Sequence, residues 1–398
     1  MNGIFVDADF YQLNKYKEIV SGDVFLISRN KEKHQIVCTL SDGLGSGIKA
    51  NVLASLTSHM AHKLSFSPIE LVHSAEILMN TLPVCKDRNI SYSTFSIADV
   101  RFSNLKENNL VHLVEYDNPK ALLFNESNLG IIERDVLELN RPNAFKREVV
   151  TSANIRLNIN DRIVLFSDGI SQAGLGDERP FGWTAKGVSD FVIKCIEKDP
   201  YISSRSLSKA IVQQASIYDG RKPKDDMTAC VIHCREPRCT LVVTGPPFTN
   251  DGDEILGKKI NDFNGKIIVS GGTTAKIVSR VLSRPLRVDM STFTKNIPPL
   301  STMDGIDLVT EGMITLNAVA KILEEKKSIT LLEDSAVKRI ARLLLDSDRI
   351  HFIVGTRINE MYQNPNLPYE VGIRRTLVNR IRKALEDNFI KVTTLEYL

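Results

Sequence analysis

The sequence has few cysteines, little net charge and no long apolar run. Six cysteines in 398 residues are sparse, so we expect reduced thiols rather than a disulfide framework. A net charge of +3 argues against nucleic-acid binding through phosphate neutralisation. No eighteen uncharged apolar residues follow one another, and the first residues do not resemble a leader. We therefore expect a cytoplasmic protein that binds neither nucleic acid nor membrane.

The length of the chain predicts more than one domain. A chain of 398 residues exceeds one typical hydrophobic core. Hydrophobic residues make up 42% and charged residues 25%, which is ordinary for a globular protein. The pattern of strands and helices changes near Glu236-Pro237, so we expect domains at residues 1–236 and 237–398.

A glycine-rich turn organises the first domain. Residues 34–40 read as a strand, and the spacing of apolar residues predicts a helix over 50–64. Between them, Asp42 is followed by Gly43, Gly45 and Gly47. An aspartate beside exposed backbone groups suits a hard divalent cation or a phosphate.

Three further aspartates stand at strand edges. Asp23 precedes the apolar run 24–27, Asp168 follows the run 162–166, and Asp225 precedes the run 229–232. Taken singly, each is an ordinary turn residue. As an ordered set with Asp42 they can supply the several carboxylate oxygens that Mg²⁺ and Mn²⁺ require.

The order of strands and helices predicts an α+β fold. Strands are expected within 4–40, two helices over about 50–64 and about 68–82, then a meander, with further helices over 184–197 and 203–217. The meander includes a strand over 130–133. This order describes two antiparallel sheets enclosed by helices.

These motifs resemble a known enzyme family. Gly22-Asp23, residues 42–50, residues 165–170 with Ala173, Phe181-Gly182, and residues 225–228 occur in the order of the metal-dependent (PPM, type 2C) serine/threonine phosphatases. They are most similar to the bacterial branch that contains the sporulation stage II protein E phosphatase. The resemblance implies a four-layer β-sandwich flanked by helices, two Mn²⁺ or Mg²⁺ ions, and hydrolysis of phosphoserine or phosphothreonine on a protein.

The resemblance also implies roles for individual residues. Asp42 and Asp168 would act in catalysis through a metal-activated water. The implied metal ligands are Asp23, Asp42, Gly43, Asp168 and Asp225. Asp226 stands where many relatives have Asn, so it is expected to support the ligands together with Gly45, Ser46 and Gly47.

Two cysteine-based alternatives are weaker. None of the six cysteines begins a Cys-x5-Arg loop, so the sequence lacks the nucleophile loop of thiol phosphatases. Cys230, Cys234 and Cys239 with His233 invite a zinc site. Their spacing on one strand fits poorly with paired zinc knuckles, and packing is the favoured interpretation.

The second domain is expected to be a smaller α/β domain with a largely parallel sheet. A strand over 265–269 runs into a turn and a helix, and this turn is either a candidate anion site or a set of helix caps. The turn consists of Ser270, Gly271, Gly272, Thr273 and Thr274. No catalytic motif is evident over 240–398, so we expect a regulatory, ligand-binding or partner-binding role.

The sequence leaves the binding partner and the overall function undecided. The resemblance suggests a phosphorylated protein substrate, such as one of the anti-sigma antagonist type, and a homodimer is left open. The alternative function is a ligand-sensing signalling protein. In that case the phosphatase-like half is a scaffold and the C-terminal domain binds phosphate or a nucleotide.

Overall fold

The chain divides into two compact units. In the computed structural model, one unit runs from Asn2 to Glu236 and the other from Pro237 to Leu398. The residues described are 4–30, 33–67, 70–81, 84–85, 90–91, 93–102, 109–139, 148–176, 179–289, 300–327, 334–357, 368–389 and 391–398. Every helix found among them is too short or too polar to cross a lipid bilayer.

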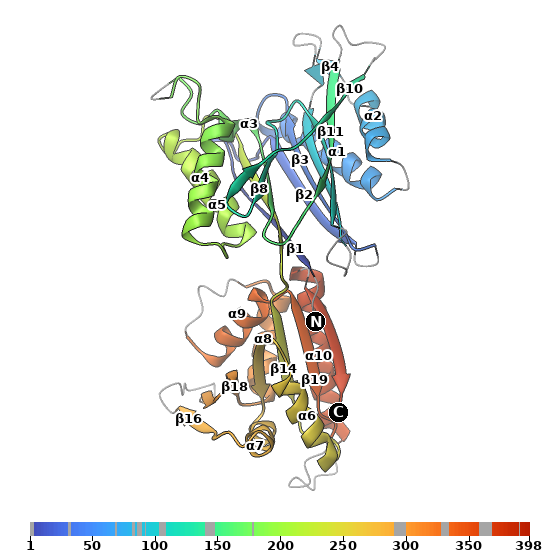
Figure 1. Ribbon diagram of the computed structural model, residues 1–398, viewed down its shortest axis with the longest axis vertical. Coiled ribbons are helices and arrows are strands. Elements are labelled where there is room, and N and C mark those ends of the chain that lie inside the picture. Colours follow the sequence, from blue (N-terminus) through green and yellow to red (C-terminus); the bar gives the residue numbers. More distant parts are fainter. Residues whose placement is uncertain are drawn as a thin grey trace. The chain divides into compact units, whose positions relative to one another are not determined.

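Two antiparallel sheets form the centre of the first unit (Figure 1). The five-stranded sheet has the order β1 (Phe5–Leu13), β13 (Met227–Arg235), β12 (Arg162–Phe166), β8 (Leu122–Asn125) and β9 (Asn128–Gly130). The six-stranded sheet has the order β10 (Asp135–Leu139), β11 (Glu148–Arg156), β7 (Leu110–Tyr116), β6 (Ser93–Arg101), β3 (Gln35–Gly43) and β2 (Asp23–Asn30). The short strands β4 (Val84–Cys85) and β5 (Ile90–Ser91) pair separately.

Helices cover the outer face of each sheet. Figure 1 shows α1 (Gly47–Ser65) and α2 (Leu71–Thr81) beside the six-stranded sheet, with α4 (Thr184–Lys198) and α5 (Ser204–Tyr218) on the opposite side of the unit. A short helix, α3 (Asp168–Ser171), follows β12. The expected four-layer α+β architecture is confirmed for this unit.

Three apolar clusters hold these four layers together. One cluster lies between the sheets and includes Leu40 and Cys230. A second joins the five-stranded sheet to α4 and α5, and a third joins the six-stranded sheet to α1 and α2. Strand β3 is buried along most of its length because its alternate side chains enter the first and third clusters.

Some expected boundaries were wrong. The strand expected over 130–133 is replaced by β9 and β10, and residues 131–134 connect them. Ile131 is 88% exposed, so the apolar run there does not mark a buried strand. The first helix begins at Gly47, earlier than expected. Part of the expected start of the second helix, at 68–69, lies outside the described residues.

The second unit contains a mostly parallel sheet with the order β16-β17-β18-β15-β14-β19-β20. Five neighbouring strands are parallel, whereas β16 and β17 pair antiparallel. Their bounds are β14 (Cys239–Thr244), β15 (Lys266–Ser270), β16 (Arg287–Asp289), β17 (Leu300–Met303), β18 (Ile306–Thr310), β19 (Arg349–Val354) and β20 (Val392–Tyr397).

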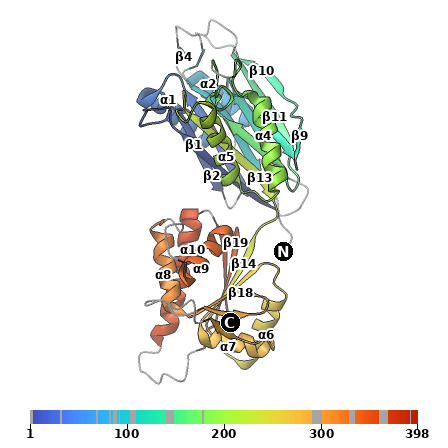
Figure 2. The same cartoon turned by 90° about the vertical axis from the view of Figure 1, so that its left-hand side faces the viewer.

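Helices pack on both faces of this sheet (Figure 2). One face carries α6 (Asn250–Asn261) and α7 (Gly272–Val281). The other carries α8 (Met313–Glu324), α9 (Ala336–Asp346) and α10 (Pro368–Phe389). The elements α6, β16, β17 and β20 were not predicted from the sequence.

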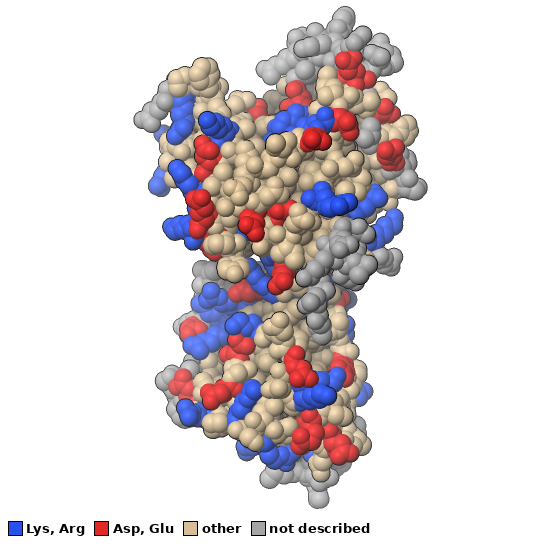
Figure 3. Space-filling view, in the orientation of Figure 1, with Lys and Arg blue, Asp and Glu red and all other residues tan. Residues whose placement is uncertain are grey.

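Acidic and basic side chains are mixed on the surface. On the face drawn in Figure 3, described Lys and Arg side chains are interspersed with Asp and Glu side chains in both units. This distribution agrees with the small net charge of +3.

Candidate metal centre

Two of the four aspartates face each other across neighbouring strands. Asp23 begins β2, Asp42 lies near the end of β3, and the two residues are register partners. Side chains opposite each other in such a pair lie about 5 Å apart at Cβ. Leu40, two residues before Asp42, packs between the sheets. Asp42 therefore points from the same face of β3 into the end of the sandwich.

The other sheet supplies the remaining acidic residues. Asp168 is the first residue of α3, directly after β12, and Asp225 and Asp226 come directly before β13. The main chains of Ser167 and Thr228 are joined by a hydrogen bond of 3.0 Å. The pairing of β12 with β13 therefore brings residues about sixty positions apart in the sequence to one end of the sheet.

Asp226 ties the two sheets together. One of its carboxylate oxygens accepts a hydrogen bond from the backbone N–H of Lys15 at 2.9 Å, and the other accepts one from Gly22 at 2.8 Å. Asp226 is 4% exposed. Because both oxygens are engaged by backbone groups, this carboxylate is suited to fixing the loop before Asp23 rather than to binding an ion.

Thr228 makes a second connection between the sheets. Its hydroxyl donates to Oδ2 of Asp23 at 2.7 Å and accepts from the Gln12 side-chain amide at 2.9 Å. The same amide donates to the backbone oxygen of Asp23. These bonds fix the orientation of the Asp23 carboxyl group.

A cavity of about 1070 Å³ opens at this end of the sandwich. Asp42, Gly43, Asp168 and Asp225 line it, whereas Asp23 is buried and is not among the lining residues. Four of the five expected ligands thus share one cavity.

The glycine-rich turn forms part of the same cavity wall. Gly45 and Ser46 line it, and Ser46 is the N-cap residue of α1. The backbone φ angles of Gly45 and Gly47 are 103° and 69°, a region that side chains other than glycine strongly disfavour. These two glycines allow the chain to turn directly from Asp42 into the helix.

The acidic side chains raise one another's pKa values. Burial, followed by the Asp23, Asp168 and Asp225 carboxylates, raises the pKa of Asp42 to about 9. Burial also raises the pKa of Asp23 well above its ordinary value, and burial and Asp225 raise that of Asp168. Like charges in a poorly solvated site have this effect, and a bound cation would relieve it.

The donor set fits a hard divalent cation, although the ligands are not preassembled. Among the described residues, no group of three His, Cys, Asp or Glu side chains is placed so that it could bind one metal ion. Holding an ion therefore requires the carboxyl groups to turn toward a common point. Oδ1 of Asp23 is buried and accepts no hydrogen bond. A buried carboxylate oxygen without a partner costs free energy unless a hydrogen-bond donor or a cation is supplied. Carboxylate and backbone carbonyl oxygens are the ligands that Mg²⁺ and Mn²⁺ prefer.

Several cavity residues were missed by sequence reasoning. The lining includes Ser93 and Thr94 from β6, Lys120 from the loop after β7, and Thr151 from β11. Ser93 donates a hydrogen bond to the backbone oxygen of Asp42 at 3.0 Å. None of them belongs to a motif with acidic residues, so the sequence offered no signal for them.

The candidate anion turn belongs to the second unit, at the end of β15 and the start of α7. Ser270 is buried, and its hydroxyl donates to the backbone oxygen of Glu311 at 3.2 Å. Gly271 is the N-cap residue of α7, with a φ angle of 121°. Thr274 is buried and Thr273 is exposed. Anion binding at this turn stays a prediction.

The cysteines considered for zinc lie on or next to β13. Cys230 and Cys234 are buried in the cluster between the two sheets, and both are free thiols, as is Cys239. In the described part of the chain, these cysteines and His233 are not placed so that three of them could bind one zinc ion.

More than half of the chain matches one protein family. Residues 32–235 match the model of the family described as Stage II sporulation protein E (SpoIIE), just over half of the 398 residues. The chain belongs to the SpoIIE family. The resemblance expected from the motifs is confirmed, and this SpoIIE-family chain is a protein serine/threonine phosphatase of the PP2C type.

Solved structures similar to this SpoIIE-family chain are distant. The phosphatase domain of SpoIIE from Bacillus subtilis is 16% identical with a TM-score of 0.43, and the match covers 59% of this chain and 95% of that one. RsbX in complex with magnesium is 16% identical with a TM-score of 0.39, covering 57% and 95%. The RsbU and RsbW domains of a Mycobacterium tuberculosis protein are 14% identical with a TM-score of 0.42, covering 66% and 68%. No curated protein matches the chain. The family assignment rests on the family model alone.

Proposed function

We propose that the first unit hydrolyses phosphoserine or phosphothreonine on a partner protein by direct attack of water, with two Mn²⁺ or Mg²⁺ ions. Asp23, Asp42, Gly43, Asp168 and Asp225 would hold the ions. The observation that carries this proposal is the gathering of acidic side chains from both sheets at one cavity, where the pKa of Asp42 is raised to about 9. Such a cluster is costly for the protein unless cations bind there.

When bound, two divalent cations lower the pKa of a water molecule and neutralise the charge of the transferring phosphoryl group. The chain's own residues orient the ligands. Thr228 fixes Asp23, and the Gln172 side chain donates to Oδ2 of Asp168 at 2.9 Å. Asp226 holds the loop that precedes Asp23.

A covalent thiol mechanism has no nucleophile in this cavity. No cysteine is among the described residues that line it. Cys230 is buried in the core between the sheets, and burial raises the pKa of its thiol well above the ordinary value. A buried thiol with a raised pKa is a poor nucleophile.

We further propose that the substrate is a phosphorylated signalling protein of the anti-sigma antagonist type, as the family resemblance suggests. The second unit, residues 237–398, would regulate the phosphatase or bind a ligand or partner. Its separate parallel sheet and its own apolar clusters are consistent with an independent binding function.

The test is a phosphate-release assay on the full chain with phosphoserine and phosphothreonine peptides. We expect release with Mn²⁺, loss of activity with EDTA, and recovery when Mn²⁺ is added in excess. An Asp168→Asn variant is expected to be inactive, whereas Asp190→Asn, an exposed residue on α4, should retain activity. Release that is insensitive to EDTA, or no release from any peptide, would refute the proposal.

A further inference from the structure

The cavity has a side wall that the proposed ion ligands do not use. Glu115 on β7 and Thr151 on β11 are register partners. The register partners Leu113 and Ala153, two residues before Glu115 and two residues after Thr151, pack between the sheets. The side chains of Glu115 and Thr151 therefore point toward the space between the sheets, at the same end as Asp42.

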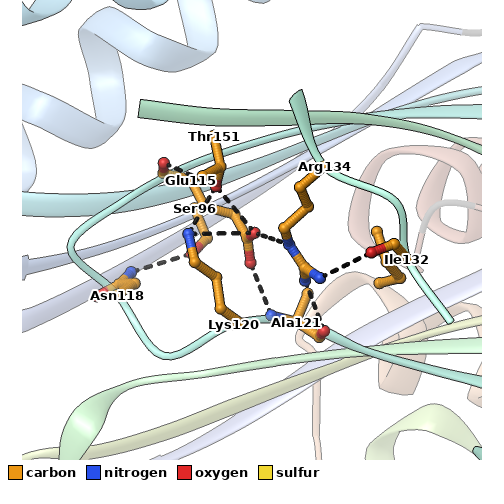
Figure 4. Close-up of polar contacts among 8 residues, drawn as sticks. All are labelled: Ser96, Glu115, Asn118, Lys120, Ala121, Ile132, Arg134 and Thr151. Carbon is orange, nitrogen blue, oxygen red and sulfur yellow. Dashed lines mark hydrogen bonds and ion pairs between the residues drawn. The ribbon is translucent and has the colours of Figure 1, made fainter. Parts of the chain in front are cut away.

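Glu115 is buried and already neutralised. Its side chain is 1% exposed. Oε2 lies 2.7 Å from Nε of Arg134, and Oε1 accepts the backbone N–H of Ala121 at 2.7 Å. Arg134 also donates to the backbone oxygens of Ala121 and Ile132 (Figure 4). The guanidinium group therefore satisfies the charge of Glu115 without help from another cation.

Lys120 adds a second positive charge to this wall. Its Nζ donates to Oγ1 of Thr151 at 2.6 Å and lies 3.7 Å from Oε2 of Glu115 (Figure 4). Its side chain is 48% exposed, and Lys120 lines the cavity. Asp117 lines the cavity as well. Burial lowers the pKa of Lys120 from its ordinary value. The ammonium group is thus held in place by the wall with part of its surface facing the cavity.

The loop that carries Lys120 is fixed relative to Asp42. The Asn118 side chain donates to Oγ of Ser96 at 3.2 Å and accepts from Oγ1 of Thr94 at 2.6 Å. Thr94 is the register partner of Asp42 on the neighbouring strand. Two hydrogen bonds and one strand pairing therefore connect the loop to the strand of Asp42.

The strand order gives the distance between Lys120 and the acidic centre. Nζ of Lys120 contacts Glu115 on β7 and Thr151 on β11. These strands are two and three positions from β3, or about 10–14 Å at the usual spacing of about 4.8 Å. An extended peptide covers about 3.3 Å per residue. A substrate segment with its phosphorylated residue at Asp42 would thus place a residue about three or four positions away beside Lys120.

From this geometry we propose that Lys120 determines substrate specificity. It binds an anionic side chain, a carboxylate or a second phosphate, about three or four residues from the phosphorylated serine or threonine. The inference rests on the proposed function, because it assumes that the phosphoryl group lies at the acidic centre. The acidic centre itself repels an anionic substrate, so a fixed cation on the wall gives acidic segments a favourable position.

The experiment compares two phosphoserine peptides that differ only in having Glu or Gln at the positions three and four residues from the phosphoserine. For the full chain with Mn²⁺, we expect a kcat/KM about five-fold higher for the Glu peptide, the size of a partly exposed ion pair. Lys120→Met should reduce this ratio to about one, and Lys120→Arg should keep it. Lys194→Met, on the exposed face of α4, is the matched control and should also keep it.

A salt titration of the wild type gives a readout that does not depend on how any variant folds. The preference for the Glu peptide should decline as ionic strength rises, because salt screens an exposed ion pair. Equal rates on both peptides, an unchanged ratio in Lys120→Met, or an equal loss of kcat/KM on both peptides would overturn the role of Lys120.

Binding separates this inference from the proposed function. Phosphonate analogues of the two peptides, which cannot be hydrolysed, can be compared by fluorescence anisotropy. If the wild type hydrolyses neither phosphopeptide, the proposed function fails. Tighter binding of the Glu analogue, lost in Lys120→Met, would still support the role of Lys120, and equal binding would overturn it.

Discussion

Replacing Asp42 with asparagine is expected to lower kcat on a phosphoserine peptide by about 10³-fold or more. Phosphate monoesters react extremely slowly without catalysis, and most of the acceleration in the proposed mechanism depends on the ions. Asp42 interacts with the other acidic groups of the cavity, since burial and then the charges of Asp23, Asp168 and Asp225 raise its pKa. Phosphate release measured with saturating Mn²⁺ tests this, with Asp190→Asn as the control. An Asp42→Asn enzyme within ten-fold of the wild type would contradict the proposed role.

The same substitution is expected to stabilise the metal-free protein. In the folded state the pKa of Asp42 is about 9, compared with an ordinary value of 3.8, so the folded protein binds this proton more tightly than the unfolded chain. For this group, the free energy of unfolding is highest below pH 4 and falls as pH rises toward 9, by at most about 1.4 kcal/mol per pH unit. We expect Tm in EDTA to fall from pH 5 to pH 9 in the wild type and to fall less in Asp42→Asn. If Tm fell equally with pH in both proteins, the pKa of Asp42 would not be raised in the folded state.

Gly169→Ala is expected to disrupt the acidic centre through the backbone. A Cβ atom at Gly169 would lie 2.1 Å from the backbone oxygen of Asp226, far inside any allowed contact. The clash must separate α3 from the segment before β13, and with it Asp168 from Asp225. We expect the free energy of unfolding to fall by about 1–3 kcal/mol and kcat to fall by about 10²-fold, since displacing a catalytic group by about 1 Å has that effect.

Denaturant unfolding and phosphate release measure the two consequences of Gly169→Ala. The matched control is Gly372→Ala on α10, where an added Cβ would meet nothing within 4 Å. That control should leave both quantities close to the wild-type values. A Gly169→Ala protein with unchanged stability would show that the contact between α3 and Asp226 is looser than the structure has it.

The sequence predicted those features that depend on neighbouring residues. Strand β2 follows from the apolar run 24–27 and strand β3 from the run 34–40, with a charged turn between them. The pairing of Asp23 with Asp42 is a consequence, since both stand at the same end of one hairpin. The turn after Asp42 was also predictable, because glycine has a local conformational role there.

Features that depend on distant contacts could not be predicted in this way. Lys120 is distinguished from other lysines by its place beside Glu115 and Thr151, which lie on two different strands. Arg134 comes directly after the stretch 130–133 that reads as a strand, but in the structure it belongs to the connection after β9 and pairs with Glu115. Helix α6 has an N-cap, Thr249, but few apolar residues to reveal a helical period.

The most direct test of the central claim is anomalous diffraction from a crystal of the full chain soaked in Mn²⁺. We expect two manganese peaks at the end of the sandwich, bound by carboxylate oxygens of Asp23, Asp42, Asp168 and Asp225 and by the backbone oxygen of Gly43. Manganese bound elsewhere, or absent from this cavity in an enzyme that Mn²⁺ activates, would contradict it.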